Sequence, residues 1–191
     1  MNDILKGSLV QLGAVDPEEY SRAFAQWRRD SELMRLMDTS EVMLRSEKDS
    51  QKWIEKELED QDVNQYMFTI RTLAEDKFIG DIGLYVVSWP GRDAFVGLGI
   101  GERDLWGRGY GTDAMQVILR YAFTEINLRR VTLSVFEYNP RAVRSYEKAG
   151  FVHEGRMRQF LNREGKRWDM LFMGILREEW VQMQKEERDN R

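Results

Sequence analysis

The stretch that decides the fold of this chain runs from Leu98 to Thr112 and reads LGIGERDLWGRGYGT. An apolar strand pattern enters a loop with glycines at positions 107, 109 and 111, and a helical pattern extends from Gly107 to about Ile126. Glycines let the backbone approach a phosphate closely, and the first amides of a helix point at an anion held there. With Arg108 adding positive charge, the loop is typical of a pyrophosphate cradle. Taken alone, it also fits an ordinary tight turn.

Two other nucleotide-binding loops fit this stretch less well. The loop lacks the Gly-Lys-Ser/Thr ending of a P-loop. It also lacks the Gly-x-Gly-x-x-Gly spacing and lies in the middle of the chain, which argues against a Rossmann site. The glycine pattern therefore indicates an anion site of another kind.

A second informative stretch lies about thirty residues downstream, from Asn139 to Phe151, and reads NPRAVRSYEKAGF. Asn139 has the side chain of a helix N-cap, and Pro140 suits the first helical turn. Gly150 is typical of the left-handed residue that ends a helix. The stretch therefore predicts a helix between these two boundaries.

These two stretches, in this order and at this distance, resemble the signatures of the GNAT superfamily of acetyltransferases. The run from Arg108 to Thr112 is similar to that family's coenzyme A pyrophosphate loop, and the run from Asn139 to Phe151 is similar to its second signature. The segment from Asp169 to Trp180 resembles the RimJ/RimL-like and spermidine N-acetyltransferase branches. The resemblance is specific over about residues 95–180 and only general over 1–70.

The resemblance implies an α/β fold of the mixed α+β kind, as a single GNAT-like domain with a central, mixed, mostly antiparallel twisted sheet flanked by helices. It places residues 1–191 in one acetyltransferase domain, with acceptor-side helices at about 16–60 and an acyl-CoA-binding core at about 95–180. The order of helical and alternating patterns independently predicts one sheet in a mixed α/β domain. The expected strands cover 9–12, 66–71, 78–87, 94–101, 131–135, 152–160 and 168–176. The expected helices cover 17–37 with a break near 30–31, 46 or 48 to 59, 107–126 and 140–149, and the last ten residues are expected to fray.

Length and charge narrow the function classes. A chain of 191 residues is long enough for one domain with a full core. Its 29 Lys and Arg against 33 Asp and Glu leave a net charge of -4, which argues against a nucleic-acid partner. No apolar run reaches the roughly 20 residues of a membrane span or resembles a signal peptide, so we expect a cytoplasmic protein without a membrane partner.

The chain has no cysteine, which excludes disulfides, a cysteine nucleophile and thiolate metal sites. Its single histidine, His153, cannot build a multi-histidine zinc site, and we expect no metal. A Ser-His-Asp hydrolase would have to use this histidine, and no Gly-x-Ser-x-Gly elbow precedes it. Proton transfer is therefore expected from Tyr, Asp, Glu or water.

The resemblance also implies a reaction. Acetyl-CoA is the expected cosubstrate, and its acetyl group passes directly to a primary amine, such as a protein N-terminus, a polyamine or another small amine, without an acyl-enzyme. The expected oxyanion donor is a backbone N–H near Gly99 to Gly101, and Tyr146 lies at the family's general-acid position. A phenol with a pKa of about 10 stays protonated at neutral pH until a thiolate with a pKa of about 8.5 leaves. Outside this motif, Tyr146 would fit a core aromatic on a helix face.

The sequence identifies the general base least clearly. Glu102 follows the expected oxyanion strand, and we hypothesise that it deprotonates the amine. Asp169 and Glu137 are alternatives, and a chain of water molecules can replace all three. A solvated surface carboxylate is the simpler interpretation of each of them.

The expected coenzyme-binding residues come from the glycine loop, the strand before it and the helix that Asn139 caps. They are Gly99, Ile100, Gly101, Trp106, Gly107, Arg108, Gly109, Tyr110, Gly111, Thr112, Asn139, Arg141, Arg144 and Lys148. Trp106 departs from the family, whose loop often has Gln or Arg there, so one phosphate-side donor is missing. The three basic residues of the helix are expected at the phosphates, although each also fits a solvated helix charge. Ser145 is expected to support Tyr146.

The acceptor side is less specified. The residues that could line an acceptor pocket, and equally could form a core, are Trp27, Met34, Met37, Trp53 and Trp89. The acids that could meet a cationic amine, and equally could face solvent, are Glu32, Asp38 and Glu41. Two alternative functions stay open: a non-catalytic acyl-CoA-binding or sensor module on the same fold, and a nucleotide-binding protein unrelated to coenzyme A. By analogy with the family we expect a homodimer.

Overall fold

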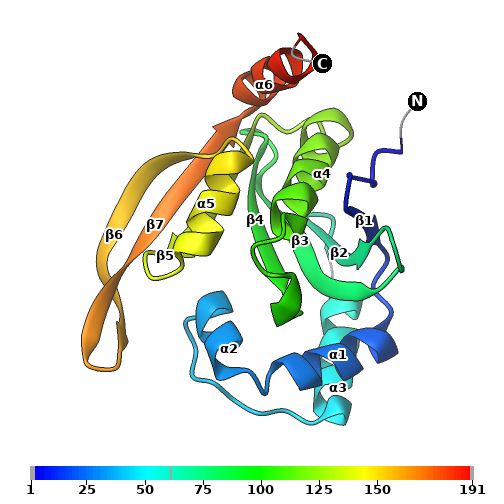
Figure 1. Ribbon diagram of the computed structural model, residues 1–191, viewed down its shortest axis with the longest axis vertical. Helices are drawn as coiled ribbons and strands as arrows, with labels where there is room; N and C mark the ends of the chain where they lie inside the picture. The colour runs from blue at the N-terminus through cyan, green and yellow to red at the C-terminus, as the bar shows by residue number, and fades with distance from the viewer. Residues whose placement is uncertain (1–2, 61, 190–191) are drawn as a thin grey trace.

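One sheet forms the centre of the molecule, with helices in front of it and at both ends (Figure 1). The computed structural model describes residues 3–60 and 62–189. The strands are β1 (Val10–Gly13), β2 (Gln65–Thr72), β3 (Phe78–Ser88), β4 (Asp93–Ile100), β5 (Arg130–Phe136), β6 (Val152–Arg163) and β7 (Lys166–Leu176). The helices are α1 (Pro17–Trp27), α2 (Ser31–Met37), α3 (Glu47–Glu59), α4 (Tyr110–Thr124), α5 (Pro140–Lys148) and α6 (Arg177–Asp189), with a short 3-10 turn, η1 (Arg103–Leu105), before α4.

The sheet has the strand order β1-β2-β3-β4-β5-β7-β6 within the described residues. β4 and β5 are parallel, and the other neighbouring pairs are antiparallel. The predicted fold, a mixed and mostly antiparallel sheet flanked by helices, is therefore confirmed.

Polar caps begin the three N-terminal helices, at the expected start near residue 17, at the expected break near 30–31 and at the first of the two expected starts of the third helix. The Asp16 carboxylate accepts a hydrogen bond from a first-turn N–H, and Pro17 opens α1. Asp30 caps α2 in the same way, which explains the break between the first two helices. Ser46 caps α3. Each cap satisfies an N–H that has no partner inside its own helix.

The two faces of the sheet carry separate hydrophobic cores. On one face α4 packs over side chains such as Ile82, which is fully buried, and forms the main core. α1, α2 and α3 gather at one end of the molecule (Figure 1) and form a second core around Tyr20 and Phe24, whose rings are 5.3 Å apart. Neighbouring residues of β2 show the division, because Phe68 packs against the first core and Met67 against the second.

β4 and β5 separate after a short paired region. Their pairing covers Asp93–Phe95 and Arg130–Thr132, and the two strands continue to Ile100 and Phe136 without pairing to each other. Because the strands are parallel, they diverge at the same end. The divergence opens a gap inside the sheet.

The structure differs from the prediction at the start of α4. This helix begins at Tyr110 and not at Gly107. The reason is local, because Gly107 and Gly109 have φ angles of 74° and 94°. Left-handed residues of this kind cannot belong to a right-handed helix, so the glycine segment stays a loop.

The prediction that the C-terminal residues fray is wrong for those the structure describes. α6 continues to Asp189, and residues 190 and 191 lie outside the described part. The Trp180 ring lies 5.5 Å from the Phe123 ring of α4. Met183 packs so closely on Gly150 that a Cβ there would lie 2.3 Å from the Met183 sulfur. These contacts hold the helix against the main core. Among the described helices, none combines the length and apolar composition that crossing a membrane requires.

Candidate active site

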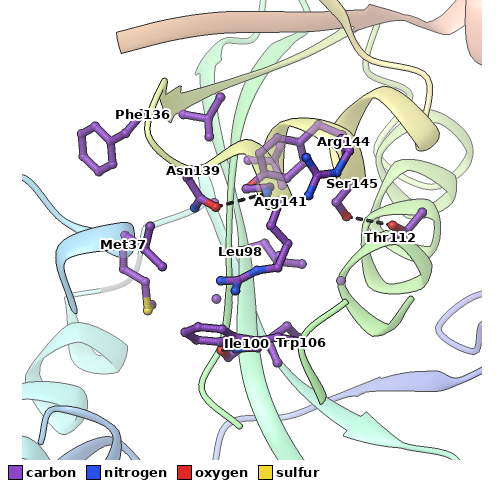
Figure 2. A pocket seen from close by; sticks show the side chains of 18 of the residues that line it. Met37, Leu98, Ile100, Trp106, Thr112, Phe136, Asn139, Arg141, Arg144 and Ser145 are labelled. Atoms are coloured by element: carbon purple, nitrogen blue, oxygen red, sulfur yellow. Dashed lines mark hydrogen bonds between the residues drawn. The ribbon is translucent and has the colours of Figure 1, made fainter. Parts of the chain in front are cut away.

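A cavity of about 570 Å³ occupies the gap between β4 and β5 (Figure 2). Its walls come from β4, the glycine loop, α4, α5, β5 and α2. The expected coenzyme-binding residues that line it are Gly99, Ile100, Trp106, Gly107, Gly109, Tyr110, Gly111, Thr112, Asn139, Arg141, Arg144 and Lys148. Tyr146 lines the same cavity, whereas Gly101, Glu102 and Arg108 do not. The structure therefore brings most of the expected residues to one place.

The backbone of β4 offers hydrogen-bond donors to this cavity. The Gly101 N–H donates to the Ile79 carbonyl of β3 at 2.9 Å. Alternation along an antiparallel pair directs the Gly99 N–H to β3 as well, and turns the N–H groups of Leu98 and Ile100 toward the gap. Of the three residues expected to supply the oxyanion donor, only Ile100 thus has a suitably directed N–H, and Leu98 adds a second one that the sequence analysis did not name.

The glycine loop leads directly into the N-terminus of α4. Gly109 is the N-cap residue, and no side chain caps the helix. The first amides of α4, at Tyr110, Gly111 and Thr112, therefore point toward the cavity without a side-chain partner. Free amides and the positive end of the helix dipole favour an anion at this place. Arg108 is exposed and lies outside the cavity lining.

Trp106 has a role that the family resemblance did not indicate. Its indole N–H donates to the Ile100 carbonyl at 2.8 Å. The Arg141 guanidinium stacks on its ring at 3.6 Å from the centroid (Figure 2), and Arg103 stacks at 4.7 Å. Arg103 in turn pairs with Asp30 of the α1–α2 junction. Trp106 therefore holds Arg141 in place beside the cavity.

The N-terminal part of α5 supplies the polar wall opposite β4. The Asn139 side chain caps α5 by accepting the Ala142 N–H at 3.2 Å. Ser145 bonds the Thr112 hydroxyl at 2.8 Å and so ties α5 to α4 (Figure 2). This contact differs from the expected support of Tyr146. The other basic residues of the helix, Arg144 and Lys148, are exposed at the rim.

Tyr146 is buried, with 8% of its surface exposed. Burial raises its pKa to about 12. The phenol is therefore fully protonated at neutral pH, and it lies in a water-poor part of the cavity. Such a group keeps its proton at neutral pH and can give it to the sulfur of a departing thiolate as the C–S bond breaks.

The position of Glu102 weighs against its role as general base. Its carboxylate accepts hydrogen bonds from the Trp27 indole at 2.9 Å and from the Lys77 ammonium. Burial raises its pKa, but the hydrogen bonds from Lys77 and Trp27 outweigh this effect, so the pKa of Glu102 lies below its usual range. A carboxylate committed to two donors outside the cavity is a weak base for a bound amine. Its assignment as base stays a prediction.

The alternative bases are also engaged in other contacts. Asp169 pairs with Arg156 at 3.1 Å, and the Glu137 carboxylate accepts the Asp169 N–H at 2.9 Å. His153 is exposed and lies 3.1 Å from a Glu147 oxygen. None of these residues lines the cavity.

On the acceptor side, Met37 and Asp38 line the cavity. The other expected apolar residues are structural: Trp27 and Met34 are buried in the second core, Trp53 packs against it, and Trp89 is exposed and bonds Asn64. Of the expected acids, Glu32 pairs with Arg103, and Glu41 is exposed away from the cavity.

One feature near the cavity was not predicted from the sequence. Asp81 lies within β3, between the buried residues Gly80 and Ile82. It pairs in register with Gly99. Burial raises the pKa of Asp81 to about 7, although a hydrogen bond from Tyr20 opposes the shift. The available signal was an acid inside an otherwise apolar strand, since such a residue usually has a specific reason to be there.

Known proteins share both the sequence pattern and the fold. The family model described as Acetyltransferase (GNAT) domain matches residues 10–152. The SPbeta prophage-derived uncharacterized N-acetyltransferase YokL of Bacillus subtilis (strain 168) is 27% identical over 183 residues, which cover 91% of this chain and 93% of the relative. Spermidine N(1)-acetyltransferase of Vibrio cholerae serotype O1 is 31% identical over 108 residues, which cover 56% of this chain and 62% of the relative.

One solved structure shows the likeness of fold. The crystal structure of spermidine N-acetyltransferase from Vibrio cholerae in complex with CoA and spermine superposes with a TM-score of 0.77. The match covers 90% of this chain and 98% of that one, at 24% identity. At this level of identity the likeness concerns the fold.

Proposed function

The chain belongs to the GNAT acetyltransferase family, and from this premise we propose that it transfers an acetyl group from acetyl-CoA to a primary amine. It is an acyltransferase of the N-acetyltransferase type. One observation carries the finer proposal: the uncapped N-terminus of α4, the free N–H groups of β4 and the protonated Tyr146 all border one cavity. These are the groups that direct acyl transfer requires.

Each group has a task in the proposed reaction. The amides of the glycine loop and α4 hold the coenzyme pyrophosphate, with Arg141 and the rim cations beside it. When the amine attacks the thioester carbon, the N–H groups of Leu98 and Ile100 stabilise the oxyanion that forms. The C–S bond then breaks, and Tyr146 gives its proton to the sulfur.

We propose a protein N-terminus, a polyamine or another small amine as the acceptor. The relative named spermidine N(1)-acetyltransferase supports a polyamine, although its match covers 56% of this chain. Apolar side chains of Met37, Phe95 and Phe136 line the acceptor end of the cavity, and Asp38 is the acid among the expected residues that could meet a cation there.

Binding and turnover test this proposal in sequence. Acetyl-CoA at about a hundred times its dissociation constant stabilises a protein by about 2.7 kcal/mol, which for this size raises the melting temperature by roughly 5 to 10 °C. ATP serves as the control. A thiol-release assay over spermidine, spermine, lysine amide and short peptides with free N-termini then follows. The cysteine-free chain adds no thiol of its own to this assay.

The outcomes separate the alternatives. A rise with acetyl-CoA together with thiol release supports the proposal. A rise without turnover on any amine supports the non-catalytic acyl-CoA-binding module instead. No rise with acetyl-CoA, or an equal rise with ATP, contradicts the coenzyme site. Homodimer formation stays a prediction by analogy, which light scattering during gel filtration would test.

A further inference from the structure

We propose that Asp81 of β3 is the group that accepts the proton of the attacking amine. This inference rests on the proposed acetyl transfer. It replaces the sequence-based hypothesis for Glu102 with a carboxylate on the neighbouring strand. Three features of the structure carry it: the register of β3 against β4, the flexible cover over Gly99, and the partners of the carboxylate.

The register places Asp81 beside the reacting centre. Asp81 lies directly opposite Gly99, and residues paired in this way point to the same face of a sheet. A Cβ built on Gly99 would lie 3.9 Å from a carboxylate oxygen of Asp81. Gly99 lies between Leu98 and Ile100, whose N–H groups turn toward the gap. The carboxylate is therefore one strand away from the place where the oxyanion forms.

The face that Asp81 shares with Gly99 becomes open to an amine when one flexible side chain moves. Gly97 and Gly99 both line the cavity and carry no side chain, and a Cβ at Gly97 would meet no atom within 4 Å. The Met37 methyl group lies over Gly99, 2.4 Å from a Cβ built there. Met37 is 39% exposed and has a flexible side chain, so it can move aside for a ligand. An amine over Gly99 would then lie beside the Asp81 carboxylate.

The partners of Asp81 leave its carboxylate able to take up a proton. Within the described part of the chain, no Lys, Arg or His nitrogen lies within 4.0 Å of it, in contrast to Glu102, which pairs with Lys77. The groups that face it are the Tyr20 hydroxyl from α1, the Tyr85 phenol on its own strand, and the uncharged Met37 and Gly99. Burial brings the pKa of Asp81 to about 7, which is the range in which a general base works best at neutral pH.

The proton transfers balance as follows. The free amine forms the N–C bond, and the carbonyl electrons move to the oxygen. Asp81 takes a proton from the nitrogen, which has become positively charged. The C–S bond breaks, and the sulfur receives the proton of Tyr146. Water then carries the proton from Asp81 to the Tyr146 phenolate, so that both groups return to their starting states.

The main test is the Asp81→Asn variant, assayed with acetyl-CoA and the fastest amine from the panel named above. Because a positioned base contributes about 100- to 10,000-fold, kcat/KM at pH 8 is expected to fall at least about 100-fold. The acid limb of the pH–rate profile near pH 7 is expected to disappear. The melting shift with acetyl-CoA is expected to stay unchanged, since Asp81 is not among the residues that line the cavity and approaches it only beside Gly99.

Tyr20→Phe is a second variant that keeps the aromatic packing and removes only the hydroxyl. The hydrogen bond from Tyr20 lowers the pKa of Asp81, so its loss is expected to move the acid limb to higher pH. Asp81→Asn with near wild-type kcat/KM and an unchanged acid limb would overturn the proposal. If that variant does not fold, a Tyr20→Phe profile identical to the wild type overturns it instead. Absence of turnover in the wild type would contradict the proposed function itself, which is a separate result.

Discussion

The gap between β4 and β5 has a coenzyme side and an acceptor side, and the two are held in place differently. Backbone features that lie close together in the sequence hold the coenzyme side. Side chains that contact residues far away in the sequence hold the acceptor side. Gly107, Gly109 and the first turn of α4 lie within a few residues of one another. On the acceptor side, Arg163 of the β6–β7 hairpin donates to the Arg35 carbonyl of α2, 128 positions away. The Tyr138 hydroxyl donates to the same carbonyl from 103 positions away. The coenzyme side can therefore keep its shape when the sequence changes elsewhere in the chain. The acceptor side keeps its shape only when the distant segments that contact it are also in place.

The largest effect on the coenzyme side is expected from Tyr146. Tyr146→Phe keeps the buried ring and removes the acid, so kcat is expected to fall by about 100- to 1000-fold, with little change in acetyl-CoA affinity. Steady-state kinetics and a thermal shift with acetyl-CoA measure the two quantities separately. An unchanged kcat would show that Tyr146 is a core aromatic residue. The coenzyme side would then bind acetyl-CoA without supplying the general acid.

The stability of the protein is expected to depend on pH through Asp81, which lies near the acceptor side. The folded-state pKa of Asp81 is about 7, above its ordinary value of 3.8, so the native state binds more protons than the unfolded state between these values. The contribution of Asp81 to the free energy of unfolding is thus fully present at low pH, and it is lost as the pH rises through 7. Asp81→Asn is expected to be more stable than the wild type at pH 8 by roughly 1–3 kcal/mol, and the difference should shrink toward pH 5. Urea unfolding at both pH values measures it, and a constant difference would contradict the assigned pKa.

The glycine loop provides the next test. Gly109→Ala places a Cβ on a residue with φ 94°, and the left-handed conformation is expected to cost about 1–2 kcal/mol and to weaken acetyl-CoA binding. Gly155→Ala is the matched control, because a Cβ there would meet no atom within 4 Å. The control is expected to change stability by less than about 0.5 kcal/mol. Equal effects of the two substitutions would show that the loop conformation is not special.

The smallest expected effect concerns Arg163 in the hairpin. Its guanidinium bonds the carbonyl of Arg35 within α2 and those of Asp38 and Ser40 just after the helix. Arg163→Lys keeps the charge but cannot make the forked contact, so KM for the amine is expected to rise by about three- to tenfold with KM for acetyl-CoA unchanged. Equal changes in both KM values would show that the coenzyme side and the acceptor side are coupled.

The sequence predicted most elements because their signals are local. The caps at Asp16, Asp30 and Asn139 lie where the residue types require them. α6 was missed because its polar sequence hides the packing of Trp180 and Met183 against the main core. The start of α4 was misplaced because three glycines within a helical pattern do not reveal which of them adopt left-handed angles.

Some parts of the candidate site could be predicted from the sequence, and others could not. The residue pattern predicted the glycine loop and the helix that Asn139 caps, and the family resemblance predicted the place of Tyr146 in the site. Trp106 was expected in the coenzyme site without the donor that Gln or Arg supplies in the family, and the structure shows it stacking on Arg141 and bonding the Ile100 carbonyl. Whether a given carboxylate can serve as base depends on its neighbours, and those of Glu102 and Asp81 come from other elements.

By itself the sequence determined the capped starts of α1, α2 and α5, the strand patterns and the position of the glycine loop, because backbone conformation there is set by residue type and by neighbours a few positions away. The tertiary structure decided which side chains meet: Asp81 opposite Gly99, Arg163 on the end of α2, and Arg141 on Trp106. The physical reason is that burial and charge pairing depend on groups distant in the chain. The register of β3 against β4 and the packing of α1–α3 on the sheet set the environment of Asp81, and no local pattern in β3 contains that information.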